Sequence, residues 1–379
     1  MTMLNKKPKV LFFSTTSYVE PIQESISKKF NILEELATIK IFAYRAGEAN
    51  GHPGSSIFHL FKRPNNRFTR YIKTVFITLF TMRGHFSKAD IVVIQDPVLA
   101  GFVLLSFKGL NNKPKLVVES HGDFIETITL EKNLLFPWFY KFILKKIASY
   151  SLNKANCIRV ISSSTRYQVE SFVKNKPIVK FPAWIDLENY LNTKHNPSDS
   201  IVLFLGGITE RKNPLLILRS LSYIKSKCIF KLYIVGPQLN NTYLELLKEY
   251  IRNNNLEERV VIKEEVGQKE VIDYLSKSSL LVLPSKSEGL GRVILEAQAV
   301  GCPVLVSDAG GMKDLIEHKK TGFIFKNEDL IDLGDNIEFI LKNNEIVNDI
   351  TQSGKENVIE FYKSNSFLNG YKQIFEKVK

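Results

Sequence analysis

Short apolar runs alternate with amphipathic segments along most of the chain. Short runs rich in Val, Ile, Leu and Phe are typical of buried strands, whereas apolar positions three or four apart indicate one face of a helix. In the first half we predict strands at 9–14, 38–44, 91–94, 115–119 and 157–161. Helices are predicted at 21–30, 68–82, 98–107, 137–152 and 165–172. This alternation is typical of an α/β fold with a parallel sheet covered by helices on both faces.

The alternation restarts after a polar stretch at 192–200, which we take as a linker. Further strands are predicted at 201–205, 230–235, 260–262, 280–283 and 304–306, and helices at 214–224, 243–251, 270–275, from Gly291 onward and over 329–379. Two doubly wound units in tandem place a ligand in the cleft between them, at the carboxyl ends of the strands. We therefore predict an N-terminal domain at 1–185 and a C-terminal domain at 186–364, with the amphipathic helix at 365–379 packing back on the first.

Two segments of the first domain have distinct patterns. Residues 45–66 are rich in glycine, proline and serine, which predicts a long loop, and loops of that length are usually functional or disordered. In the helix at 68–82, one apolar face is predicted from helical spacing. It consists of Phe68, Tyr71, Ile72, Val75, Phe76 and Leu79.

Two carboxylates eight positions apart, Glu288 and Glu296, lie in a strand, turn, helix, strand pattern. Glu288 is predicted in the loop before a helix that begins near Gly291, where an ordinary helix cap is one interpretation. Glu296 lies about two turns into this helix. We expect the helix to be largely buried, and a buried carboxylate needs a partner. Hydroxyls of a sugar or ribose, a backbone N–H group or a cation would serve.

A second candidate site is the loop from Gly206 and Gly207 to Arg211 and Lys212, directly before a helix that begins at Pro214. Free backbone N–H groups, the helix dipole and two cations converge there, which indicates an anion site that fits a phosphate. A tight turn with solvent-exposed cations is the alternative.

Polar residues also follow strands of the first domain. Ser14, Thr15 and Thr16 come at the end of the first strand, where their hydroxyls suit an acceptor or a phosphate, or simply form a polar turn. His121 follows the strand at 115–119 and is expected to face the cleft, although a single histidine is often a structural residue.

Composition and charge bear on the classes of partner and on the cellular compartment. The formal net charge of +13 fits an acidic partner, such as nucleic acid, an anionic membrane or a phosphorylated substrate, and equally fits a lysine-rich surface that is simply solvated. We find no nucleic-acid-binding motif, which disfavours nucleic acid. The three cysteines are far apart in sequence, which favours buried thiols in a reducing compartment. The apolar run at 10–13 is too short for a signal peptide, and the longest apolar window, 91–107, is interrupted by polar residues. We expect a cytoplasmic protein.

Basic and aromatic residues are mixed in two stretches of the first domain. Such mixtures suit peripheral attachment to the anionic inner face of a membrane that holds a lipid-linked acceptor. The alternative is that the aromatic side chains are core and the cations are solvated. The residues are Arg63, Arg67, Arg70 and Lys73, and Phe136, Trp138, Phe139, Tyr140, Lys141, Lys145 and Lys146.

The stretch around the two carboxylates resembles the E-x7-E signature of retaining GT-B glycosyltransferases of the family 4 type. The resemblance rests on Glu288, Gly289, Leu290, Gly291, Leu295, Glu296, Ala297, Gly301, Pro303, Val304, Gly310, Gly311, Thr321 and Gly322. It implies a GT-B fold, an acceptor-binding first domain and a second domain that binds a nucleotide diphosphate sugar.

The resemblance also implies roles for residues. Glu288 would hold donor-sugar hydroxyls, Glu296 the ribose, and Lys212 the diphosphate, while His121 would contact the donor sugar or the acceptor. The donor site would further include Gly207, Arg211, Gly289, Leu290 and Gly291. No D-x-D occurs in the sequence, so we expect neither metal nor cofactor, with Lys212 stabilising the departing diphosphate.

Two positions depart from the family pattern. Gly207 stands where the family usually has an arginine, for which Arg211 is a candidate replacement, and Ser14 to Thr16 stand where a glycine-rich loop is common. The expected function is retaining sugar transfer to a saccharide or lipid-linked saccharide in cell-surface glycan synthesis. A nucleotide-sugar epimerase and a catalytically silent binding subunit remain alternatives. A nicotinamide dehydrogenase is disfavoured, because no G-x-G-x-x-G follows either domain's first strand.

Overall fold

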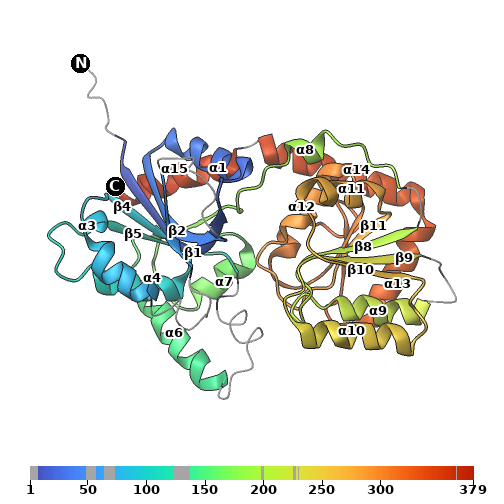
Figure 1. The fold of residues 1–379 in the computed structure, drawn as a ribbon. Coiled ribbons are helices and arrows are strands. Elements are labelled where there is room, and N and C mark those ends of the chain that lie inside the picture. The colour runs from blue at the N-terminus through green and yellow to red at the C-terminus, as the bar shows by residue number, and fades with distance from the viewer. Residues whose placement is uncertain are drawn as a thin grey trace. The chain divides into compact units, whose positions relative to one another are not determined.

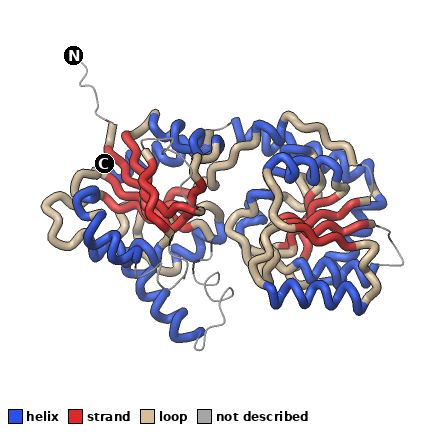
Figure 2. The backbone as a smooth tube through the Cα atoms, viewed as in Figure 1, coloured by secondary structure: helices blue, strands red, loops and turns tan. Residues whose placement is uncertain are grey.

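The computed structural model describes residues 7–47, 57–63, 73–122, 124, 137–197, 200–224, 228, 230–363 and 365–379. The chain divides into two compact units. The first runs to Trp184 and includes Ser366–Lys379, and the second runs from Ile185 to Asn365. Each unit is a parallel sheet with helices packed on its faces (Figure 1, Figure 2). This confirms the predicted α/β class with two doubly wound sheets.

The first unit contains a seven-stranded sheet in the order β3-β2-β1-β4-β5-β6-β7. Its strands are β1 (Lys9–Val19), β2 (Thr38–Ala46), β3 (Phe58–Lys62), β4 (Ile91–Ile94), β5 (Lys115–Ser120), β6 (Cys157–Val160) and β7 (Ile178–Lys180). Its helical elements are α1 (Glu24–Glu34), η1 (Ile77–Thr81), α3 (Arg83–Phe86), α4 (Pro97–Ser106), α6 (Pro137–Lys154), α7 (Ser163–Glu170) and α15 (Ser366–Val378). The chain order reverses between β1 and β4, the point at which doubly wound sheets usually bind ligands.

The two faces of this sheet have separate cores, because successive strand residues point to opposite faces. On one face, Val118 of β5 belongs to the core formed with α4, including Leu99. On the other face, Val117 belongs to the core that includes Phe30 of α1 and Tyr371 of α15. The last helix of the chain therefore covers one face of the first sheet.

The second unit contains a six-stranded sheet in the order β10-β9-β8-β11-β12-β13. Its strands are β8 (Ile201–Leu205), β9 (Lys231–Val235), β10 (Val260–Lys263), β11 (Leu280–Leu283), β12 (Val304–Ser307) and β13 (Phe323–Phe325). Its helical elements are α8 (Glu188–Leu191), α9 (Pro214–Ile224), α10 (Asn241–Asn253), α11 (Gln268–Lys277), α12 (Arg292–Val300), η2 (Gly310–Asp314), α13 (Leu330–Lys342) and α14 (Asn344–Lys363). Because β8 lies beside β11, the loops that follow these two strands emerge next to each other.

The predicted loop at 45–66 is wrong in part. Arg45 and Ala46 end β2, and Phe58–Lys62 forms the edge strand β3, while 48–56 and 64–66 lie outside the described residues. Phe58 is buried in the same core as Phe30, which holds the edge strand in place. The strand forms here because of this packing. The glycine, proline and serine content of the segment had predicted a loop instead.

The predicted apolar face of the helix at 68–82 is wrong at Phe76, which is exposed, while Val75 and Leu79 are half-buried. Residues 68–72 lie outside the described residues, and a π-helical turn occupies Ile77–Thr81. Phe76 and Phe80 are exposed and stack with ring centroids 5.7 Å apart, whereas Ile77 and Thr78 are buried. A π turn contains an extra residue, so it rotates the buried face relative to a regular α-helix. Among the described helices, none combines the length and apolar character that crossing a bilayer requires.

Candidate active site

The loops after β8 and β11 bring Arg211, Lys212 and Glu288 together in the second unit. Lys212 Nζ donates a hydrogen bond to Glu288 Oε2, and Arg211 Nη1 lies 3.7 Å from the same oxygen. Arg211 also donates to the Ser287 carbonyl at 3.0 Å. The three charged side chains are 15 to 19% exposed, so they are desolvated in part but still accessible. Two cations around one carboxylate leave an excess positive charge, which favours an anionic ligand.

Backbone packing fixes the position of Glu288. Gly310 has φ +62°, and a Cβ at this residue would lie 2.1 Å from the Glu288 carbonyl oxygen. The Gly311 N–H donates to that oxygen at 2.9 Å. Glu288 does not cap α12, because the N-cap residue is Gly291 in the left-handed region. The helix-cap interpretation of Glu288 is therefore wrong, and its side chain pairs with Lys212 instead.

Glu296 lies in α12, which is largely buried as predicted, but the residue itself is not fully buried. The residue is half-buried, while Leu295 and Ala297 beside it belong to the core of the second unit. Burial raises the pKa of the Glu296 carboxyl, and Arg292 opposes this rise. Within the described part of the chain, neither carboxylate oxygen accepts a hydrogen bond. The carboxylate therefore keeps its accepting capacity for a ligand.

Gly207 belongs to a loop in which backbone segments approach closely. A Cβ on Gly236 would lie 2.1 Å from the Gly206 carbonyl oxygen, and one on Gly207 would lie 3.0 Å from Leu239 Cδ1. A larger side chain at position 207 would therefore have to displace Leu239. Gly289, Leu290 and Gly291 connect Glu288 to α12, and Leu290 is buried.

In the first unit, His121 follows β5 and its side chain is 35% exposed. Its Nε2 atom lies 2.7 Å from Glu119 Oε2. Glu119 is fully buried, and its Oε1 atom binds Arg159 Nη1 at 3.1 Å and the hydroxyl of Tyr371. Burial alone would raise the pKa of the Glu119 carboxyl, but Arg159, His121 and Tyr371 hold it well below its usual range.

The sequence reasoning missed Glu119, Arg159 and Tyr371 as neighbours of His121. A signal was present, because Glu119 and Arg159 lie inside two predicted strands where ionisable side chains are rarely buried without a partner. Parallel pairing of β5 with β6 makes these two residues Cα partners. The contact of Tyr371 depends on where the last helix packs, which no local pattern reveals.

The predicted polar turn at Ser14, Thr15 and Thr16 is instead part of β1, where the pairing with β2 shifts register between Phe13 and Ser17. Ser14 is buried, and its Oγ accepts the Thr16 N–H at 3.3 Å. Thr16 is exposed and Thr15 is half-buried. These two residues therefore present the accessible hydroxyls.

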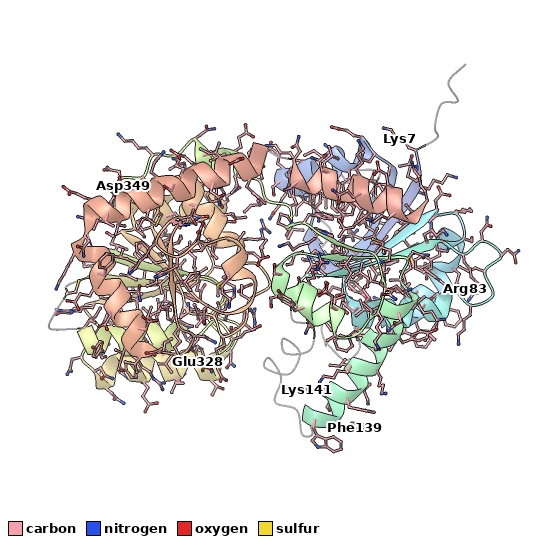
Figure 3. All side chains as sticks on the ribbon, turned by 180° about the vertical axis from the view of Figure 1, so that it is seen from behind. Lys7, Arg83, Phe139, Lys141, Glu328 and Asp349 are labelled. Carbon is pink, nitrogen blue, oxygen red and sulfur yellow. The ribbon has the colours of Figure 1, made fainter. Side chains whose placement is uncertain are left out.

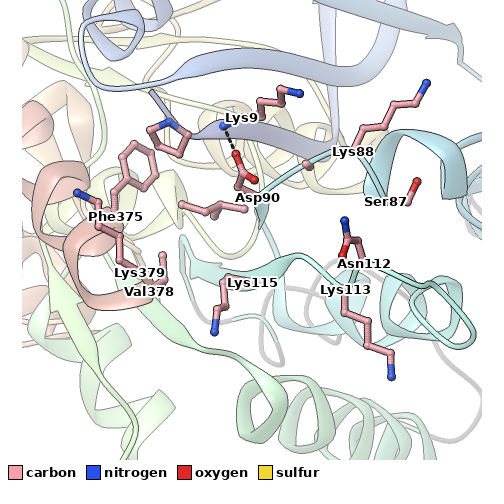
Figure 4. Close-up of a pocket in the computed structure, with 13 residues that line it drawn as sticks. Lys9, Ser87, Lys88, Asp90, Asn112, Lys113, Lys115, Phe375, Val378 and Lys379 are labelled. Carbon is pink, nitrogen blue, oxygen red and sulfur yellow. Dashed lines mark hydrogen bonds between the residues drawn. The ribbon is translucent and has the colours of Figure 1, made fainter. Parts of the chain in front are cut away.

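A cavity of about 620 Å³ lies elsewhere in the first unit (Figure 4). It is lined by residues at the amino ends of β1, β4 and β5, where the Lys9 N–H donates to Asp90 at 2.7 Å. Lys88, Lys113 and Lys115 line it, but Figure 4 shows their side chains diverging. Ligands of doubly wound sheets bind at the carboxyl ends of the strands, so we assign the candidate site to the loops there despite this cavity's size.

Comparisons with known proteins agree with this arrangement. The family model described as glycosyl transferases group 1 matches residues 188–357, and that described as glycosyltransferase family 4 matches 37–189. The chain is 25% identical over 282 residues to N-acetyl-alpha-D-glucosaminyl L-malate synthase of Bacillus anthracis, covering 71% of this chain and 69% of that protein. It is 25% identical over 262 residues to poly(ribitol-phosphate) alpha-N-acetylglucosaminyltransferase of Staphylococcus aureus, covering 68% and 49%.

Solved structures share the fold. Sucrose-phosphate synthase of Thermosynechococcus elongatus superimposes with a TM-score of 0.79 at 16% identity, over 98% of this chain and 100% of that one. Anabaena HepE in complex with UDP and glucose gives a TM-score of 0.72 at 16% identity, over 98% and 99%. The two family models together span both units of the chain. The protein thus has the GT-B fold and belongs to the glycosyltransferases of the family 4 type.

Proposed function

We propose that the protein is a retaining glycosyltransferase that moves a sugar from a nucleotide diphosphate sugar to a hydroxyl of a saccharide or lipid-linked saccharide. The observation that carries this proposal is the convergence of Arg211, Lys212 and Glu288 in the second unit. The names of the relatives support a sugar-transfer reaction, and the HepE title supports a uridine diphosphate donor. We place the reaction in cell-surface glycan synthesis.

The charges of the site suit departure of a diphosphate. Lys212 and Arg211 would stabilise the negative charge that develops as the bond to the sugar breaks, the part that a metal ion takes in other enzymes. We therefore propose a reaction that needs neither metal nor cofactor, with the acceptor attacking on the face from which the diphosphate departs. Arg211 would supply the second cation, in place of the arginine that the family usually has at position 207.

The two carboxylates would act as hydrogen-bond acceptors. Glu288, oriented by Lys212, would accept from donor-sugar hydroxyls, and Glu296, whose oxygens are free of protein donors in the described part of the chain, would accept from the ribose. Gly289, Leu290 and Gly291 would form the wall beside the sugar. His121 would contact a sugar hydroxyl rather than act as a strong base, because burial lowers its pKa below the ordinary value. Thr15 and Thr16 would contribute hydroxyls on the acceptor side.

An anionic membrane surface is the proposed partner of α6. This helix carries four lysines and no acidic residue, and Lys145 and Lys146 are exposed. Its exposed apolar side chains include Trp138 and Phe142, at 71% and 56%. Figure 3 shows Phe139 and Lys141 near the amino end of the helix. Exposed aromatic side chains with interspersed lysines favour the interface of an anionic bilayer, where a lipid-linked acceptor would be held. Of the other residues in this expectation, Arg67, Arg70 and Phe136 lie outside the described residues.

Transfer assays with stereochemical readout test the proposed function. The chain is incubated with nucleotide sugars and saccharide acceptors, and NMR of the anomeric proton should show a product with the donor's configuration. Glu288→Gln and Lys212→Ala should each lower transfer by roughly 100-fold or more, as expected for single contacts to a developing charge. The matched controls are Glu245→Gln and Lys248→Ala, which alter an exposed ion pair on α10.

Three results would contradict the proposal in different ways. Near wild-type transfer by Glu288→Gln and Lys212→Ala would refute the site. An inverted product would refute the retaining mechanism. Conversion of a nucleotide sugar without any acceptor would establish the alternative epimerase, and a chain that binds donors without turnover would be the silent subunit.

A further inference from the structure

A buried ionic network lies directly behind His121 in the first unit. Glu119 of β5 and Arg159 of β6 are Cα partners across the sheet, and both are buried to 1% exposure or less. Their side chains lie on the face covered by α15, whose Tyr371 hydroxyl bonds to Glu119 Oε1 and lies 3.2 Å from Arg159 Nη1. Burying an ion pair carries a desolvation cost that apolar side chains would avoid. The network therefore calls for an explanation other than stability.

Further contacts restrict the movement of the network. Arg159 Nη2 donates to the Pro182 carbonyl at 2.8 Å, and the guanidinium lies 4.1 Å from the ring centroid of Phe181. The Tyr371 ring packs edge-on against Phe12 and Phe181 at centroid distances of 5.7 and 5.2 Å. Glu119 Oε1 is thus held by two donors that are themselves fixed.

The other oxygen of Glu119 sets the proton position on His121. Because the pKa of Glu119 lies well below its usual range, the carboxylate is ionised and only accepts hydrogen bonds. The His121 Nε2 atom at 2.7 Å must therefore carry the proton. Burial lowers the pKa of the imidazole, which Glu119 raises and Arg159 and Lys29 lower. The neutral ring then has an unprotonated Nδ1 atom.

We propose that Glu119 is a positioning residue that fixes His121 as the Nε2–H tautomer and presents Nδ1 as the acceptor for a sugar hydroxyl. Arg159 and the C-terminal helix, through Tyr371, hold Glu119 in the orientation that this task requires. The inference rests on the proposed function of His121 as a sugar contact. It adds a requirement that the hydroxyl donates and the histidine accepts.

Nitrogen NMR of the full chain labelled with ¹⁵N-histidine tests the tautomer without any substrate. His121 is assigned by its absence in His121→Gln, and the coupling pattern of the ring identifies the protonated nitrogen. The wild type should show Nε2–H. In Glu119→Gln this preference should be lost, and the pKa of His121 should fall further, because the raising effect of Glu119 disappears while Arg159 and Lys29 remain. A wild-type Nδ1–H tautomer, or an unchanged spectrum in Glu119→Gln, would overturn the proposal.

Tyr371→Phe tests the link to α15 while keeping the ring and its packing. We expect kcat to fall by about tenfold, the kinetic equivalent of one hydrogen bond, with the donor KM unchanged and a shifted His121 resonance. The matched control is Tyr44→Phe, which removes a buried hydroxyl that bonds Thr74 Oγ1 at 2.7 Å in the same unit. Equal effects of the two variants on kcat and on the His121 resonance would refute the role of Tyr371.

Different experimental results would refute this inference and the proposed function. If His121→Ala retains full transfer, the sugar contact itself is wrong, whatever the tautomer. If the tautomer is wrong while Glu288→Gln and Lys212→Ala still abolish transfer, the donor site stands and only the positioning role of Glu119 is refuted.

Discussion

The ion pair between Lys212 and Glu288 joins opposite charges that the proposed reaction uses for different ligand groups. Lys212 is partly neutralised by the carboxylate that orients it. Glu288→Gln keeps the shape of the side chain but removes its charge. We therefore expect affinity for a free nucleoside diphosphate to rise by about threefold, in keeping with the strength of partly exposed ion pairs, while transfer falls. Isothermal titration calorimetry beside a transfer assay measures both, and a parallel loss of the two would contradict this division of roles.

Position 310 requires a glycine, because the backbone of Glu288 lies too close to leave room for a side chain there. Gly310→Ala combines a left-handed φ with a Cβ only 2.1 Å from the Glu288 carbonyl oxygen. We expect a destabilisation of more than about 2 kcal/mol and a drop in transfer of at least about tenfold. Both should appear in thermal unfolding and in the transfer assay.

Gly301→Ala is the control for this prediction. Gly301 lies in the same unit and has φ +94°, but its nearest contact for a Cβ is an ordinary 3.6 Å to His195 Cβ. The variant should carry the backbone strain of about 1 to 2 kcal/mol and retain transfer. Equal loss of transfer in both variants would show that Gly310 has no special effect on Glu288.

At the scale of elements, the N-terminus of α4 makes a pH-dependent contribution to the free energy of unfolding. Asp96 caps this helix by accepting the Leu99 N–H at 2.7 Å, and burial raises its pKa to about 6 from 3.8. The folded state then binds more protons than the unfolded state between these values, so this group lowers stability as the pH rises through the window. Above about pH 6 the Asp96 carboxyl is ionised, and the full free-energy cost of burying its charge remains.

Asp96→Asn should remove that cost, because asparagine caps helices as well as aspartate does. We expect the first unit of the variant to be about 1 to 3 kcal/mol more stable than wild type at pH 7.5, with no gain near pH 3.5. Hydrogen exchange of the α4 amides at the two pH values measures this difference. A gain that is independent of pH would contradict the assignment to Asp96.

The elements that the sequence predicted best are those whose burial is decided locally. The apolar runs of β4, β8 and β11 and the helix α9 begin and end at the predicted residues. The short elements β3, β7 and α8 were missed, because their formation depends on packing against a sheet edge or a neighbouring helix. The π turn of η1 was missed because an inserted residue changes the periodicity from which a face is read.

The candidate site was predictable to a similar degree. Lys212 and Glu288 are 76 positions apart, yet both follow strands, and the pairing of β8 with β11 brings their loops together. The buried network of Glu119, Arg159 and Tyr371 was not predictable, because one contact spans 252 positions and depends on how the last helix packs.

At the scale of the whole molecule, the proposed binding to an anionic membrane depends on the net charge of +13 and on the exposed aromatic side chains of α6. Vesicle sedimentation tests both features. A double substitution, Trp138→Ala with Phe139→Ala, should abolish sedimentation with vesicles that contain anionic lipid. Tyr167→Ala is the control, because this residue of α7 is also exposed, at 74%. Wild-type binding should weaken as salt rises. Equal sedimentation with neutral and anionic vesicles would contradict the electrostatic part of the proposal.

The central claim, that the second unit binds the diphosphate of a nucleotide sugar through Lys212, is tested most directly by calorimetric titration with nucleoside diphosphates. The wild type should bind at least one of them. Lys212→Ala should weaken that binding by at least about tenfold, as loss of a charge-assisted hydrogen bond implies, and Lys248→Ala should leave it unchanged. The same affinity in wild type and Lys212→Ala, or no binding of any nucleoside diphosphate, would contradict the account.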